Sequence, residues 1–283
     1  MSDINLDYDF KAENLIACGR TTKEAIEEVR NWILSLQDEY VPRTLQDEII
    51  VLFLLSCDND VALSKKTIIN FYSLKKDAPE LHDNRDPSRN DIKLALEIVH
   101  MSSIPVRTND NSVIHYFHIH DTNYKKFELI PILKLTYMLI DISQEKNPPD
   151  GLIAVLDLKG INLMHFLKIK VWVLKKYLQF LEEGMTMKIK SIHILNSAYF
   201  IDKLMAIVKS IVKNEFLNKI HIHQSDLEQE VLFQLIPKKC LPKEYGGDLP
   251  SKYELHQKTI EQFKRKQYFW NAEEQLRKSA HKE

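Results

Sequence analysis

The segment Leu241-Pro242-Lys243-Glu244-Tyr245-Gly246-Gly247 and the earlier stretch Ile192-His193-Ile194-Leu195-Asn196 together indicate the class of fold. The earlier stretch is largely apolar, as expected for a buried strand, and ends at a polar asparagine. Between the two, residues 198–213 carry apolar side chains at helical spacing, which predicts a long amphipathic helix. The order of strand, helix and closing turn is typical of an α/β unit.

Alternation of strands and helices extends through most of the chain after Val113. Four runs have the length and composition of strands: Val113–Ile119, Leu152–Leu158, Lys188–Leu195 and Lys219–His223. Three intervening stretches have helical spacing: Phe127–Ser143, Leu163–Leu181 and Ala198–Lys213. Because crossovers of this length join parallel strands, the sequence predicts an α/β fold with a mainly parallel sheet flanked by helices.

The chain before this region shows helical periodicity instead. Thr21 and Glu24 have the spacing of a capping box, Asp60 is a candidate N-cap, and a further helix is expected near Asp91 to His100. We therefore predict an N-terminal all-helical domain over residues 1–100 and an α/β domain over residues 101–250. Residues 251–283 form a charged helical tail, which we expect to pack loosely outside both domains.

Composition argues against several classes of protein. The six glycines, at positions 19, 151, 160, 184, 246 and 247, form no dinucleotide-binding motif, P-loop or nucleophile elbow. A formal charge of −1 gives no general attraction for nucleic acid. The three cysteines are scattered, and the densest apolar run, Ile49 to Leu55, is too short to span a bilayer. We expect a cytoplasmic monomer without a nucleic-acid partner.

Two His-x-His pairs, His118 with His120 and His221 with His223, raise the question of a metal site. Residues two apart on a strand share a face, and His115 would lie on the face opposite His118. Such pairs bind zinc when further ligands join them. The sequence shows no HExxH motif, no cysteine pair and no third ligand at a recognisable spacing. We therefore expect structural histidines and no metal site, with no stoichiometric zinc or iron.

Asp157, at the end of an apolar strand, has two candidate roles. Its carboxylate can act as a general base, or it can accept hydrogen bonds from the loop that follows. We favour the hydrogen-bonding role.

An apolar site and a basic surface are the main functional signals. Residues 152–156 are apolar on both faces, and Met185 and Met187 add adaptable side chains at a helix–strand junction. The apolar face of the helix predicted at 198–213 suits either the core or a membrane surface. Residues 160–223 contain ten lysines and four acidic residues, a formal charge of +6 in a nearly neutral chain. Lysines near an anionic membrane contribute about 1 kcal/mol each.

The order and spacing of these segments resemble the CRAL-TRIO family of lipid-binding proteins, most closely its tocopherol-transfer and retinaldehyde-binding branch. The segments that carry the resemblance are Asp60–Leu63, Pro79–Leu81, Asn84–Asp86, Asp157–Gly160, Lys188–Asn196, His221–His223 and Leu241–Gly247. The resemblance implies a soluble, non-enzymatic carrier without a cofactor, whose cargo is one small hydrophobic lipid such as a tocopherol, retinoid or carotenoid. It also implies an apolar pocket under a movable gate helix, lined by Leu152, Leu156, Phe180, Leu181, Met187, Ile189, Ile192, Leu204, Ile207, Val208 and Ile211.

The resemblance further implies contact with an anionic membrane. In the tocopherol-transfer branch, basic residues bind phosphoinositide headgroups, and Lys188 and Lys190 fall on two such positions, whereas Leu55 and Glu215 stand where the branch has basic residues. Peripheral membrane association is therefore expected. The residues expected to make this contact are Lys188, Lys190, Lys209 and Lys213.

Two alternatives to the carrier remain open. One is a phosphoinositide-regulated membrane-trafficking or scaffold module whose pocket is no longer used, and the other is a metal-dependent enzyme built on the His-x-His pairs. Bound lipid distinguishes the carrier from the scaffold, and metal analysis tests the enzyme.

Overall fold

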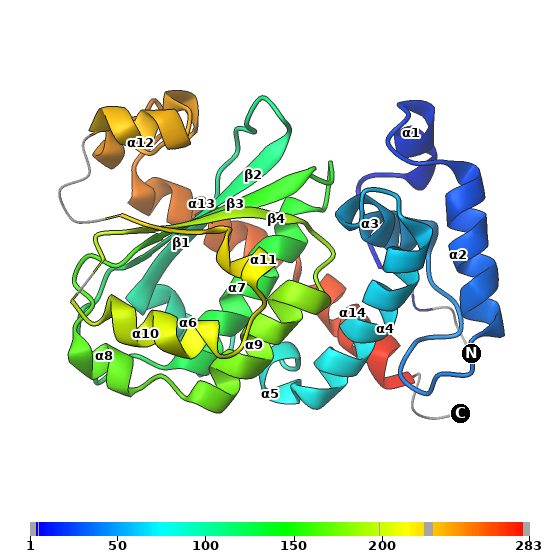
Figure 1. The fold of residues 1–283 in the computed structure, drawn as a ribbon, viewed down its shortest axis with the longest axis horizontal. Helices are drawn as coiled ribbons and strands as arrows, with labels where there is room; N and C mark the ends of the chain where they lie inside the picture. The colour runs from blue at the N-terminus through cyan, green and yellow to red at the C-terminus, as the bar shows by residue number, and fades with distance from the viewer. Residues whose placement is uncertain (1–3, 5, 198, 224–228, 280–283) are drawn as a thin grey trace.

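Five strands form a single sheet in the order β1-β2-β3-β4-β5 (Figure 1). The computed structural model describes residues 4, 6–197, 199–223 and 229–279. Strands β1 and β2 are antiparallel, and the other neighbouring strands are parallel, which confirms the predicted α/β fold. The strands are β1 (Val99–Ser103), β2 (Ser112–Ile119), β3 (Gly151–Asp157), β4 (Ile189–Leu195) and β5 (Ile220–Ile222).

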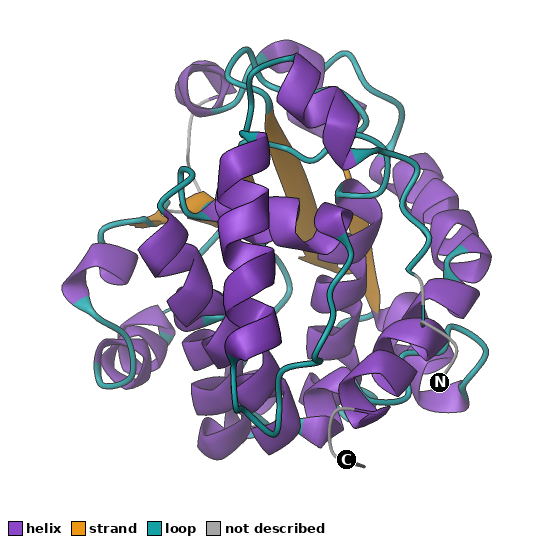
Figure 2. Cartoon of the chain, turned by 90° about the vertical axis from the view of Figure 1, so that its right-hand side faces the viewer, coloured by secondary structure: helices purple, strands orange, loops and turns teal. Residues whose placement is uncertain are grey.

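Helices enclose the sheet (Figure 2). Apolar residues of one face of β3 and β4 pack with α7, α9 and α10, and those of the other face pack with α12 and the start of α13. Two short helices, α8 and α11, connect elements of the first layer. The bounds of these helices are α7 (Leu129–Ser143), α8 (Leu163–Leu167), α9 (Val171–Glu183), α10 (Ile201–Lys209), α11 (Asn214–Leu217), α12 (Gln229–Leu235) and α13 (Lys252–Arg265).

The chain before the sheet forms helices α1 to α6. Thr22, rather than the predicted Thr21, caps α2, because its Oγ1 accepts a hydrogen bond from the Ala25 N–H at 3.1 Å. Asp60 caps α4 as expected, accepting from the Leu63 N–H at 2.9 Å. These helices are α1 (Ala12–Ala17), α2 (Lys23–Ser35), α3 (Asp47–Ser56), α4 (Val61–Asp77), α5 (Pro79–His82) and α6 (Asn90–Ile98).

The segment after residue 251 is an integral part of the molecule, so the expectation of loose packing was wrong. Phe263 at the end of α13 and Trp270 in α14 (Gln267–Ser279) are fully buried. Both belong to a core shared with α2, α3, α4 and α7, and α14 lies beside α4 (Figure 1). The charged residues that suggested a solvated tail alternate with an apolar stripe, and several of them are buried in ion pairs.

Three further boundaries differ from the sequence predictions. The helix expected to reach His100 ends at Ile98, and the next residues pair with β2 as the edge strand β1. The helix expected at 163–181 is divided into α8 and α9. The expected gate helix at 198–213 is shorter than predicted, since α10 ends at Lys209 and α11 begins only at Asn214, and the predicted first residue, Ala198, lies outside the described residues. Across the described ranges, no helix combines the length and hydropathy needed to cross a membrane.

Candidate lipid-binding site

A continuous apolar cluster lies between one face of the sheet and helices α7, α9 and α10. Because side chains alternate along a strand, Leu152, Ala154 and Leu156 of β3 all face this cluster, while Ile153 and Val155 face the opposite layer. Ten of the eleven residues predicted to line a lipid pocket belong to it: Leu152, Leu156, Phe180, Leu181, Met187, Ile189, Ile192, Leu204, Val208 and Ile211. Ile207 is half-buried on α10 and is not a member.

The cluster also contains residues that the sequence analysis did not select. Helix α7 contributes Leu133, Tyr137 and Ile140, and the segment around α11 contributes Val212 and Phe216. The signal for the α7 residues was present, since apolar side chains occur on nearly every face of that helix, as in a helix buried on all sides.

The predicted pocket residue Phe180 lies at the boundary with the N-terminal helices. Its ring centroid is 5.7 Å from Phe71 of α4, 4.7 Å from His82 of α5 and 5.1 Å from Tyr137 of α7. His82 and Tyr137 stack at 4.4 Å, and neither ring nitrogen of His82 nor the Tyr137 hydroxyl has a hydrogen-bond partner among the described residues. Burial, followed by the positive charge of Lys75, holds the pKa of His82 well below its ordinary value, so this histidine is neutral.

Helix α10 is less completely buried than α7. Ile201 and Val208 are buried, whereas Leu204, Met205 and Ile207 are half-buried. In α7, by contrast, most residues from Leu133 to Ser143 are buried. A helix with few buried apolar contacts costs less free energy to displace than a helix that is buried throughout.

A buried hydrogen-bond network lies at the carboxyl end of β3 and connects the segments that decided the fold. Asp157 accepts hydrogen bonds from the hydroxyls of Tyr116 and Tyr245, from Asn196 Nδ2 at 2.7 Å and from the Lys159 N–H at 3.0 Å. Asp157 therefore has the structural role favoured from the sequence, because its oxygens bind the following loop, β4 and the 241–247 segment.

Each of the two glycines of the 241–247 segment is required for a different structural reason. Gly246 has a φ of +73°, a backbone conformation that favours glycine. A Cβ atom on Gly247 would lie 1.9 Å from the carbonyl oxygen of Leu241, so no side chain fits there. The turn brings Tyr245 back onto the sheet, where it reaches Asp157.

The four lysines predicted to bind anionic headgroups are distributed over several elements. Lys188 pairs with Asp58 and Lys190 pairs with Asp110, both at 2.5 Å and from different loops. Lys209 is the last residue of α10, and Lys213 precedes α11 and lies 3.3 Å from Glu183. Because α10 ends at Lys209, these two lysines do not lie on one continuous helix, although the sequence predicted a single helix over residues 198–213.

An exposed apolar surface beside α10 was missed in the sequence analysis. Ring contact between Phe166 of α8 and Phe200, at 5.6 Å, places the start of α10 next to α8. The exposed Lys170 and Lys175 lie in the same stretch of chain. The signal was an apolar run that continues through the short α8 and across its junction with α9. The large exposed apolar residues of this surface are Met164, Leu167, Val171, Trp172 and Tyr199.

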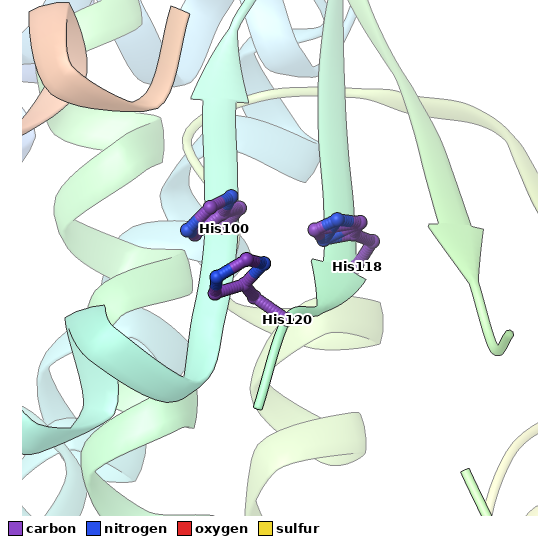
Figure 3. Close-up of side chains that lie close together, drawn as sticks. All are labelled: His100, His118 and His120. Atoms are coloured by element: carbon purple, nitrogen blue, oxygen red, sulfur yellow. The ribbon is translucent and has the colours of Figure 1, made fainter. Parts of the chain in front are cut away.

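Six histidines form two groups. His193 on β4 has Nδ1 at 3.1 Å from Nε2 of His223 and stacks on His221. In the other group, His100 of β1 lies beside His118 and His120 (Figure 3). His100 is a third possible ligand for the pair His118 and His120. It could not be recognised from the sequence because it was predicted to end a helix.

Burial lowers the pKa of His100 to about 3 and that of His118 to about 4, so both rings are neutral at physiological pH. His115, on the opposite face of β2, is fully buried, and burial lowers its pKa to about 3 as well. It belongs to neither group.

Comparison with known proteins assigns the fold to a family. Residues 100–247 match the CRAL/TRIO domain, and residues 20–92 match the Pinta-like UBA domain. Since the first match covers more than half of the chain, this protein belongs to the CRAL/TRIO family, whose members bind small lipophilic ligands and transfer them.

Individual relatives are similar over most of the chain. The "Alpha-tocopherol transfer protein-like" protein of Homo sapiens is 27% identical over 240 residues, which cover 80% of this chain and 68% of the relative. Clavesin-1 of Xenopus laevis is 22% identical over 232 residues, covering 81% of this chain and 69% of the relative. The crystal structure of Sfh5 has a TM-score of 0.54 at 10% identity and covers 82% of this chain and 90% of that one, which shows a common fold.

Proposed function

We propose that this protein is a non-enzymatic carrier that binds one tocopherol-, retinoid- or carotenoid-like lipid between its sheet and α10 and exchanges that lipid with membranes. The observation that supports the proposal is the apolar cluster between one face of the sheet and helices α7, α9 and α10, to which ten of the eleven residues predicted to line a pocket belong. The lipid is cargo, and its carriage requires no cofactor. Family membership and the similarity to alpha-tocopherol transfer protein-like relatives support this class of ligand.

Helix α10 is the proposed gate. Its residues Ile201, Leu204 and Val208 belong to the cluster, and only Ile201 and Val208 of α10 are buried, so displacement of the helix exposes little buried apolar surface. A lipid enters such a site if the apolar surface it buries repays the displacement of the helix, at about 25 cal/mol per Å². Displacement of α10 opens the cluster directly beside the exposed apolar surface of α8 and α9.

Exchange with a membrane is proposed to occur at that exposed surface. Leu167, Val171 and Trp172 would enter the interface between headgroups and acyl chains, where aromatic and aliphatic side chains are favoured. Lys188, Lys190, Lys209 and Lys213 are proposed to attract anionic lipids, phosphoinositides among them. The protein would then act in the cytoplasm as a monomer that associates peripherally and transiently with membranes.

Titration with fluorescent tocopherol, retinoid and phospholipid analogues tests the carrier. We expect saturable binding of one analogue per chain and strong loss of binding in Leu156→Trp, because the larger ring fills space between β3 and α10. Leu34→Trp, on the exposed face of α2, is the matched control and should bind normally. If folded wild-type protein binds no analogue below about 10 µM, equivalent to about 7 kcal/mol, the scaffold alternative replaces the carrier.

A further inference from the structure

Three histidines lie together at the edge of the sheet. The sequence had separated them, because it predicted that His100 ends a helix while His118 lies on a strand. His100 and His118 are direct cross-strand partners in the antiparallel β1–β2 pair, and His120 follows two residues after His118. One nitrogen of each ring lies within 4.8 Å of a nitrogen of each of the other two (Figure 3). The three side chains therefore lie together although two chain segments contribute them.

The backbone around this histidine group, defined as His100, His118 and His120, is held in place. The N–H groups of His120 and Asp121 both donate to the carbonyl of Ile98, at 2.7 and 3.2 Å. The His100 ring is buried, the His118 ring is half-buried, and the His120 ring is exposed. An ion could therefore reach the group from solvent on the side of His120.

A fourth histidine beside the group is already engaged. The ring of His256, on α13, stacks on His100 at 4.5 Å. Its Nδ1 accepts a hydrogen bond from the Met101 N–H at 3.2 Å, which leaves its Nε2–H to donate to the Leu96 carbonyl at 2.9 Å. Both ring nitrogens of His256 are thus hydrogen-bonded to the backbone, so His256 packs against the histidine group and is not counted among its ligands. In His118, by contrast, Nδ1 is buried and has no hydrogen-bond partner among the described residues.

We propose that His100, His118 and His120 bind one divalent transition-metal ion of the zinc class. Neutral imidazole nitrogens are suitable ligands for zinc, copper and nickel, and carboxylate-preferring ions such as magnesium and calcium are not expected to bind. Three protein ligands leave a fourth position of a tetrahedral ion for water. The site lies on the α13 side of the sheet, opposite the apolar cluster, so the ion and the lipid would not meet.

Binding requires a modest contraction of the group. Zinc–nitrogen bonds of about 2.0–2.1 Å place tetrahedral ligand nitrogens about 3.3 Å apart. His100 and His120 stack at 4.0 Å with their rings 13° apart, so at least the exposed His120 ring would have to rotate to turn a nitrogen toward the ion. The positive charge of Lys252 acts on His100 and His118 and opposes a cation there, and the buried Asp157 carboxylate, 4.0 Å from the Lys252 Nζ, offsets it.

Calorimetric titration of chelator-treated, full-length protein with ZnCl₂ tests the proposal, with Co²⁺ absorption spectra as a report on coordination. One ion per chain should bind, and His120→Ala should weaken binding by about 100-fold or more, because it removes a ligand without disturbing a buried residue. His118→Ala provides a second variant, and circular dichroism checks that both are folded.

His221→Ala is the matched control, since it removes a histidine from the other His-x-His pair. It should leave zinc affinity unchanged. Three results would each overturn the proposal: zinc affinity weaker than about 100 µM in the wild type, equal affinity in His120→Ala, or loss of the ion in His221→Ala.

Discussion

Lys75 of α4 and Glu273 of α14 form a buried ion pair with an Nζ–Oε1 distance of 2.8 Å, although 198 positions separate them in the sequence. Arg85 and Arg277 also contact the Glu273 carboxylate, at 2.5 and 2.9 Å. Arg85 additionally contacts Asp141 of α7 at 2.6 Å. The last helix is therefore joined electrostatically to the N-terminal helices and to the layer beneath the sheet.

Neutralising Glu273 should strongly destabilise the protein. Glu273→Gln leaves the buried cations Lys75, Arg85 and Arg277 without their common carboxylate, and breaking a buried ion pair costs about 3–5 kcal/mol. Urea unfolding followed by circular dichroism measures the change. Glu261→Gln, on the exposed surface of α13, is the matched control and should change the free energy of unfolding by less than about 0.5 kcal/mol.

Acid should weaken the fold through the same carboxylate. Burial opposes ionisation of Glu273, but Arg277, Lys75 and Arg85 outweigh it and hold its pKa well below the ordinary value of 4.5. The unfolded state then binds more protons than the folded state between these two pKa values. The stabilisation is therefore complete above the unfolded-state pKa and is lost as pH falls toward the folded-state pKa.

Unfolding free energies of wild type and Glu273→Gln, measured at a series of acidic pH values, test this. The glutamine variant should show the flatter pH dependence. Parallel profiles would mean that other carboxylates control acid unfolding.

Two of the buried tyrosines, Tyr137 and Tyr116, should respond differently to loss of the hydroxyl. Tyr137 has no hydrogen-bond partner for its buried hydroxyl among the described residues, so Tyr137→Phe should leave stability unchanged or raise it by about 1 kcal/mol. Tyr116 donates to the Asp157 carboxylate at 3.1 Å, and Tyr116→Phe should cost about 1.5–3 kcal/mol. Comparable destabilisation by both substitutions would show that Tyr137 has a partner in solution.

The sequence predicted the elements whose signals are local. The apolar runs of β2, β3 and β4 and the N-cap at Asp60 can be recognised from the local sequence, without knowing which segments pack against them. Strand β1 did not, because residues 91–100 continue a helical pattern and only pairing with β2 makes Val99 to Ser103 extended. Because the pairing of β1 with β2 was not predicted, His100 was not recognised as a neighbour of His118.

The burial of the last two helices, α13 and α14, could not be predicted for a related reason, since it depends on segments that are distant in the sequence. Charge density along residues 251–279 suggested a solvated surface, but Glu273 and Arg277 are buried against cations and carboxylates contributed by distant segments. The common face of the residues predicted to line a pocket could be predicted from local sequence. Alternation along β3 and β4 assigns Leu152, Leu156 and Ile192 to one face.

Reversing the two strand lysines should reduce binding to anionic membranes. Lys188→Glu/Lys190→Glu replaces two positive charges with two negative ones and leaves Asp58 and Asp110 without their present partners. With about 1 kcal/mol per lysine near an anionic surface, the affinity for phosphatidylserine- or phosphoinositide-containing vesicles should fall by at least tenfold at low salt. The difference should shrink at high salt, and affinity for a fluorescent lipid in detergent should not change. Unaltered vesicle co-sedimentation would mean that these lysines are only a solvated surface.

The exposed apolar surface should contribute to membrane binding in a way that salt does not screen. Leu167→Ala/Trp172→Ala removes side chains that are 64% and 52% exposed and lie beside the proposed gate. Because each methylene buried in the bilayer contributes about 0.8 kcal/mol, we expect vesicle affinity to fall by at least tenfold at both low and high salt. The matched control, Leu34→Ala/Tyr268→Ala, changes exposed apolar residues on α2 and α14, at 61% and 86% exposure, and should bind vesicles normally. A reduction that disappears at high salt, or an equal reduction in the control, would place the membrane contact elsewhere on the molecule.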